Sequence, residues 1–163
     1  MKRFIVLLAV YLTALPILAA DDIGAKQQFA QKAYMSNMFE IEAAKIEISM
    51  GRAVDAKQFA QDMLRDHSRA APPLADAAKR DGVTVLQVLD AEHQQKLAAI
   101  RHSDPTNLDQ AYISTQVTVH QQAYEMFLAY AKDGPDGALK NFATRLLPDL
   151  HMHLTRVQGM ANK

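Results

Sequence analysis

Three histidines interrupt apolar stripes in this sequence. In three separate segments, apolar residues recur every three or four positions, as on the buried face of a helix. One member of each series is a histidine: His67, His120 or His153. Imidazole is a common transition-metal ligand and titrates near neutral pH. These positions therefore predict either a metal site or a hydrogen-bonded polar cluster inside a helix bundle.

Glu40 is the carboxylate that we expect beside these histidines, although it flanks its apolar stripe. Counting from the turns that join neighbouring helices places Glu40, His67, His120 and His153 within about one helical turn of a common depth. The predicted metal ligands are these four residues, a set that suits zinc, copper or iron better than calcium or magnesium. The alternative is a packed polar core, in which each imidazole bonds a neighbouring carboxylate, amide or carbonyl.

Other chemically capable residues give weaker signals. The sequence contains no Glu-x-x-His, which argues against a di-iron carboxylate centre, and no signature of a catalytic nucleophile or phosphate loop. Helical spacing explains the methionines as core residues, although thioethers also bind copper. The residues in question are Met35, Met38, Met63 and Met126. We expect solvated positions for His93, His102 and His151 and for the pair Asp62 and Asp66.

Composition excludes several classes of function. The 163 residues carry a formal net charge of zero and no cysteine, so we expect no disulfides. No basic patch indicates a nucleic-acid partner. Lys2 and Arg3 precede a short apolar run and Ala19-Ala20, which is the pattern of a signal peptide. We therefore expect a signal peptide at residues 1–20, a mature domain at 21–163, and no stable membrane insertion after cleavage.

Four long helices and one short helix follow from the capping and stop signals. Their expected bounds are residues 21–50, 55–81, 90–101, 107–132 and 138–160. Pro72-Pro73 predict a kink or break near Ala71, and Pro148 predicts an interruption of the last helix. Thr106 and Asp109 resemble a capping box. Short loops within each helix pair and a long crossover between the pairs predict an all-α, ferritin-like four-helix bundle, with the short helix in the crossover.

Four sequence runs are similar to one known family. SNMFEIEAAKIEI, DAKQFAQDMLRDHSRA, DQAYISTQVTVHQQA and LLPDLHMHL resemble the bacterial envelope proteins grouped as domain-of-unknown-function family 4142, and the likeness covers residues 29–160. The resemblance implies a ferritin-like fold and export, with no established activity. Its motif positions fall on Glu40, Met63, Asp66, His67, Tyr112, His120, Leu147, Pro148 and His153. Pro72-Pro73 depart from the family's helical pattern.

These observations predict a non-enzymatic periplasmic protein of the bacterial envelope. Its expected partner is a metal ion, namely zinc, copper or iron, held by the buried His/Glu cluster; no protein partner is indicated. A second hypothesis is a structural or stress-related interaction module whose histidines only pack. A hydrolytic or redox metalloenzyme is the third, and the lack of paired catalytic groups argues against it.

Overall fold

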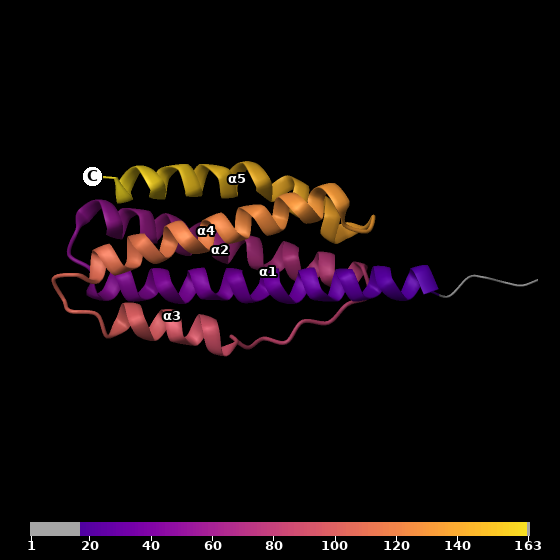
Figure 1. Ribbon diagram of the computed structural model, residues 1–163, viewed down its shortest axis with the longest axis horizontal. Coiled ribbons are helices and arrows are strands. Elements are labelled where there is room, and N and C mark those ends of the chain that lie inside the picture. The colour runs from indigo at the N-terminus through magenta and orange to yellow at the C-terminus, as the bar shows by residue number, and fades with distance from the viewer. Residues whose placement is uncertain (1–16, 163) are drawn as a thin grey trace, which may run out of the picture.

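Helices make up most of the computed structural model, which describes residues 17–162 (Figure 1). They are α1 (Ile17–Met50), α2 (Val54–Arg80), α3 (Ala91–Arg101), α4 (Leu108–Asp133) and α5 (Ala138–Ala161), and no strand occurs between residues 17 and 162. The first sixteen residues of the expected signal peptide lie outside the described part. Because α1 begins at Ile17, Asp21 and Asp22 lie inside the helix and do not cap it as predicted. Leucine and two alanines at positions 18–20 are strong helix formers, which accounts for the earlier start.

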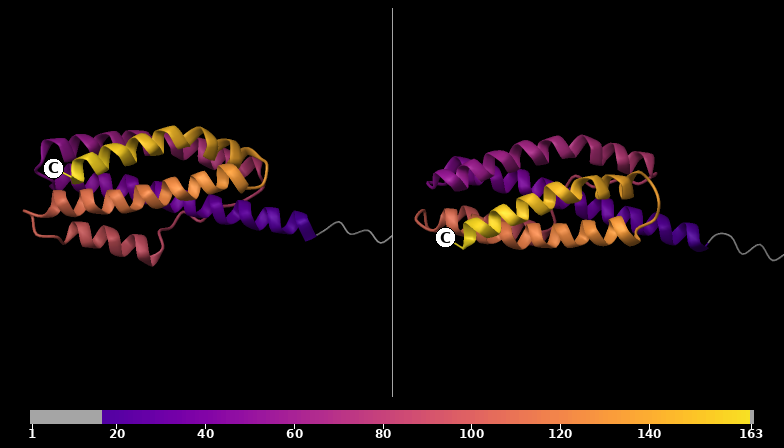
Figure 2. Two further views of the ribbon diagram at one scale, coloured as in Figure 1. Left: turned by 45° about the horizontal axis from the view of Figure 1, so that its top comes forward. Right: turned by 90° about the horizontal axis from the view of Figure 1, so that it is seen from above.

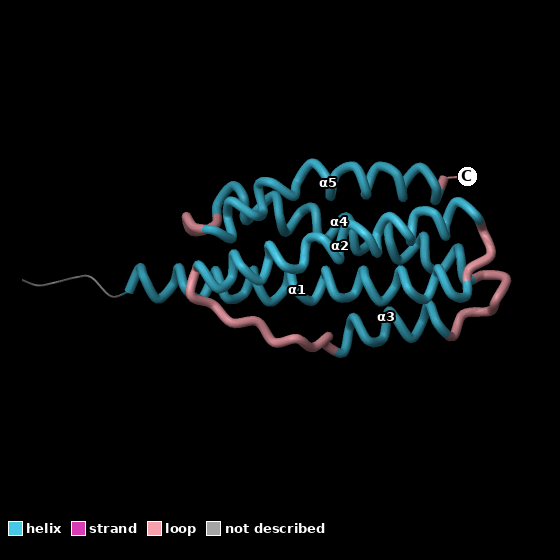
Figure 3. The backbone as a smooth tube through the Cα atoms, turned by 180° about the vertical axis from the view of Figure 1, so that it is seen from behind, coloured by secondary structure: helices cyan, strands magenta, loops and turns pink. Residues whose placement is uncertain are grey.

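The helices form two antiparallel hairpins, α1 with α2 and α4 with α5 (Figures 1 and 2). The crossover that carries α3 connects them, so α2 and α4 run parallel, and this confirms the ferritin-like bundle. Figure 3 shows the first part of the crossover passing along α1. The side chains of Gln27 and Gln31 hold this loop through hydrogen bonds to the backbones of Thr84 and Leu86.

The prolines do not break their helices. Pro72 and Pro73 lie within α2, and Pro148 lies within α5. Proline removes the hydrogen bond to the carbonyl four residues earlier, but these prolines are exposed, as are Ser68 and Arg69. Water can therefore solvate the freed carbonyls of α2. The predicted break near Ala71 is wrong, and α2 instead follows a smooth arc (Figure 2).

Two aspartates cap helices that are distant in sequence. Asp109 does not complete a capping box with Thr106; its Oδ1 accepts the backbone N–H groups of Arg52 (2.8 Å) and Ala53 (3.0 Å), at the start of α2. Asp81 accepts the N–H groups of Ala138 and Leu139 at the start of α5, both at 2.9 Å. Each cap satisfies N-terminal donors of one hairpin with a side chain of the other. The caps therefore tie the hairpins together at both ends of the bundle.

The apolar core consists of two clusters with a polar layer between them. One cluster surrounds Phe29, Leu74 and Phe142, and the other surrounds Phe59, Met63 and Val157. His67, His120 and His153 lie between these clusters along their helices and are buried. The two apolar clusters therefore place the three imidazoles in the middle of the bundle.

Candidate metal centre

Three helices bring the predicted histidines together. His67 of α2, His120 of α4 and His153 of α5 have ring centroids 5.6–6.0 Å apart, which is nearly an equilateral triangle. One ring nitrogen from each lies within 4.8 Å of the others. At a Zn–N length of 2.0–2.1 Å, tetrahedral ligand atoms are roughly 3.4 Å apart. Small side-chain rotations would therefore close the three imidazoles around one ion.

Each imidazole is oriented by a hydrogen bond from its outer nitrogen. Nδ1–H of His67 donates to Oδ1 of Asn37 (3.0 Å), and Nδ1–H of His120 donates to the carbonyl of Gln116 (3.1 Å). Nε2–H of His153 donates to Oδ2 of Asp66 (3.3 Å). Because all three partners are acceptors, they fix the tautomer of each ring, as the outer partners of metal-binding histidines do.

The second nitrogen of each ring has no hydrogen-bond partner among the described residues. These atoms are Nε2 of His67, Nε2 of His120 and Nδ1 of His153, and all three are buried. With the proton held on the outer nitrogen, each of them carries a lone pair. The alternative hypothesis, a packed polar core, therefore explains only one of the two nitrogens in each ring. The other three nitrogens are bases without a hydrogen bond within residues 17–162.

Burial keeps the imidazoles neutral. Desolvation, followed by the proximity of the other two rings, lowers the pKa of His67 well below its ordinary value of 6.5. Burial lowers the pKa of His120 to about 4. It also lowers the pKa of His153, against the opposing effect of the Asp66 carboxylate. All three rings are in the form that binds a metal at neutral pH.

Glu40 is buried as predicted, but it lies beside the outer nitrogen of a ring. It is 2 % exposed, and its Oε1 is 3.5 Å from Nδ1 of His120, the nitrogen that also faces the Gln116 carbonyl. Burial raises the pKa of Glu40 to about 8, against smaller opposing effects of Gln116 and His93. Its place as a fourth ligand stays a prediction, since the three nitrogens approach one another without it.

Other site residues differ from expectation. Asp66 was expected in solvent, yet it receives the His153 hydrogen bond and an ion pair from Arg65. His93 is half-buried and bonded to Asp90. Glu47, next to the apolar stripe of α1, is fully buried. The outer partner Asn37 stands within that stripe, and a polar residue among apolar ones was the signal that could have identified it.

No helix within residues 17–162 has the length and hydropathy that crossing a bilayer requires. No curated protein matches the sequence.

Two comparisons with known proteins are informative. A profile of the family described as "Domain of unknown function (DUF4142)" matches residues 16–160. The structure described as "Crystal structure of DUF305 fragment from Deinococcus radiodurans" superposes with a TM-score of 0.72 and 13 % sequence identity, over 85 % of this chain and 95 % of that one. At this identity the likeness concerns the fold alone, which is the ferritin-like helical bundle.

Proposed function

The chain belongs to the DUF4142 family, and we propose that it is an exported, non-enzymatic envelope protein that binds one transition-metal ion through His67, His120 and His153. The observation that carries the metal proposal is the set of three buried, unpartnered ring nitrogens, each on a ring whose other nitrogen is held by an acceptor. Export is supported by the sequence of residues 1–20 alone.

The donor set favours zinc, copper or iron over calcium and magnesium, because imidazole nitrogen suits borderline transition ions. Three protein ligands leave a fourth position for an external ligand. Burial keeps the Glu40 carboxyl protonated at neutral pH in the metal-free protein; a cation at the centre would favour its ionised form, which then increases the basicity of the His120 imidazole beside it. The direct ligand role that the sequence predicts for Glu40 stays a prediction.

The test is the metal dependence of stability in single variants. The metal-free wild type should gain about 2.7 kcal/mol at a hundredfold excess of metal over Kd. His67→Ala, His120→Ala and His153→Ala should each lose most of that gain. His151→Ala is the matched control, because His151 is exposed on α5 near His153 and should keep the full gain. Native mass spectrometry should find one ion per wild-type chain at this site.

Glu40→Gln keeps the shape of the protonated acid and prevents it from ionising when a metal ion binds. Loss of an outer partner typically lowers metal affinity by about 10–100-fold, which competition titration would measure. The alternative function, an interaction module with a packed histidine core, predicts a different outcome. Each histidine variant would then lose about 1–3 kcal/mol of stability whether metal or chelator is present. If no first-row divalent ion and no copper(I) stabilises the wild type, the metal proposal is wrong.

A further inference from the structure

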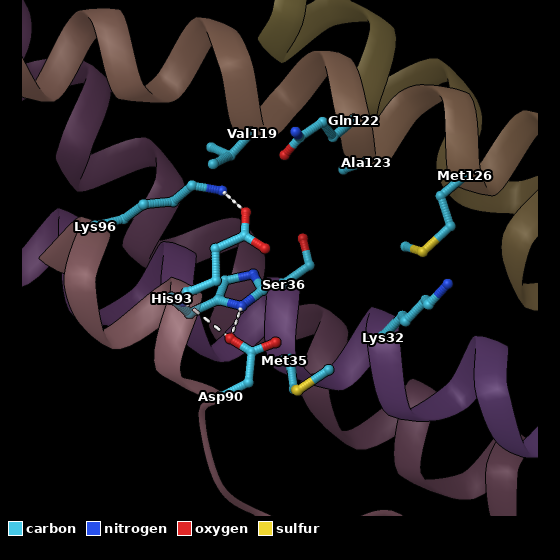
Figure 4. Close-up of a pocket in the computed structure, with 11 residues that line it drawn as sticks. Lys32, Met35, Ser36, Asp90, His93, Lys96, Val119, Gln122, Ala123 and Met126 are labelled. Atoms are coloured by element: carbon cyan, nitrogen blue, oxygen red, sulfur yellow. Dashed lines mark hydrogen bonds and ion pairs between the residues drawn. The ribbon is translucent and has the colours of Figure 1, made fainter.

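An external pocket lies between α1, α3 and α4 and is lined by two thioethers, an imidazole and the ammonium groups of Lys32 and Lys96 (Figure 4). Lys96 is paired with the Glu92 carboxylate. Its volume is about 350 Å³. Met35 enters it from α1, Met126 from α4 and His93 from α3, and Figure 4 shows all three side chains at its edge. These residues lie outside the histidine centre described above.

His93 is oriented as the buried histidines are. Its Nδ1–H donates to Oδ1 of Asp90 at 2.6 Å, and its side chain is 18 % exposed. The other ring nitrogen, Nε2, is left with a lone pair for a ligand in the pocket.

Two small side chains separate this pocket from an internal cavity. Ser36 of α1 and Ala123 of α4 line the external pocket, and the same two residues line a cavity of about 30 Å³ inside the bundle. His67 and Asn37 also line that inner cavity. The α1–α4 seam is thin at this point, and the imidazole of His67 lies behind it.

The opposite side of the inner cavity is less suited to a metal ion. A groove of about 500 Å³ between α2 and α5 adjoins the cavity there, and the shared wall consists of Ala70 and the bulky side chains of Phe142 and Leu146. The groove is lined by three guanidinium groups, two carboxylates and one thioether, namely Arg65, Arg69, Arg145, Asp66, Asp149 and Met152. Guanidinium stays protonated and has no lone pair to offer a cation, and the Asp66 carboxylate is already bonded to His153 and Arg65. The α1–α4 side instead offers two thioethers and an imidazole next to a wall of two small side chains.

We propose that His93, Met35 and Met126 form a receiving site for copper(I), from which the ion passes between Ser36 and Ala123 to His67 and the buried centre. Thioether sulfur is a soft ligand and selects copper(I) among the ions that imidazole also binds. The ion keeps its oxidation state, and one set of neutral ligands replaces another. The passage rests on the function proposed above, whereas the receiving site has an independent readout.

Stoichiometry tests the receiving site. Copper(I) titrated from a chromophoric chelator should fill two sites per wild-type chain. His120→Ala should retain one equivalent, while His93→Ala combined with Met35→Leu and Met126→Leu should retain only the buried one. The leucines conserve volume and keep the fold. Met152→Leu, an exposed methionine of the opposite groove, is the control and should leave both equivalents.

Loading kinetics test the passage. The triple variant, and Ala123→Leu separately, should slow the filling of the buried centre several-fold with little change in its equilibrium affinity. Ala129→Leu, on the exposed face of the same helix, should load at the wild-type rate. Wild-type loading rates in both test variants would overturn the passage, and two equivalents in the triple variant would overturn the receiving site. One equivalent in the wild type that His120→Ala removes would leave the proposed function standing and reject this inference.

Discussion

Replacing Glu47 by glutamine should stabilise the protein at neutral and alkaline pH. Glu47 is 0 % exposed on α1, and its carboxyl lies beside the carboxylate of Asp109. Burial first, and the neighbouring Asp109 carboxylate second, raise the pKa of Glu47 to about 8. In an unfolded chain a glutamate ionises near pH 4.3. Folding at pH 7 therefore requires the carboxyl to take up a proton.

The sign of the effect follows from this proton uptake. A carboxyl with a raised folded pKa contributes fully to stability below its unfolded pKa, and that contribution is lost as pH rises through about 8. The loss is about 4 kcal/mol at pH 7, at 1.36 kcal/mol per pKa unit. Glutamine has the shape of the protonated acid and never ionises. Glu47→Gln should therefore keep the packing and avoid the loss.

Urea unfolding of the metal-free protein between pH 5 and pH 9 measures this difference. The free energies of unfolding of wild type and Glu47→Gln should differ by about 1 kcal/mol at pH 5 and by about 4–5 kcal/mol, in favour of the variant, at pH 8. Glu42→Gln is the control, since Glu42 is partly exposed on the same helix and its substitution should stay within about 0.5 kcal/mol. A difference in the free energy of unfolding that does not change with pH would refute the conclusion that Glu47 is buried and protonated.

Two further predictions concern acid and export. Because burial lowers the pKa of His120 to about 4, its contribution to stability is complete above about pH 6.5 and is lost as pH falls; metal-free wild type should lose about 2 kcal/mol from this residue by pH 5. In His120→Gln, the free energy of urea unfolding should no longer show this loss as pH falls to 5. An unchanged pH dependence would contradict the burial of the His120 imidazole. N-terminal sequencing of periplasmic protein should begin near Asp21, whereas an intact Met1 in the membrane fraction would exclude cleavage.

The helices and the histidine centre could be predicted because both depend on periodicity. A histidine in a stripe of apolar residues has to face the core wherever the helix packs, so His67, His120 and His153 were identifiable without coordinates. The short loops and the long crossover then determined which helices run parallel. Matching the depths of the histidines required only the rise of a helix and the lengths of the loops.

The contacts around the centre could not be predicted from periodicity. Whether Asp66 faces solvent or reaches His153 depends on the rotation of α2 against α5 and on a rotamer, and neither is visible in the spacing of residues. The capping box expected for Thr106 and Asp109 was wrong for a similar reason, because the backbone groups that Asp109 binds lie more than fifty positions away in the sequence. Glu47 contradicts the general rule that carboxylates avoid the interior, so a sequence argument places it outside.

The polar layer costs stability in the metal-free protein. A buried polar atom without a partner costs about 1–3 kcal/mol, and the three inner imidazole nitrogens lie between two apolar clusters. Leucine or valine in the same layer would continue those clusters and remove the cost, as in bundles built for stability alone. The outer partners Asn37 and Asp66 satisfy one nitrogen of their rings and leave the other unpaired. Under the proposal that the centre binds a metal, one ion would supply the missing partner to all three rings at once and offset this cost.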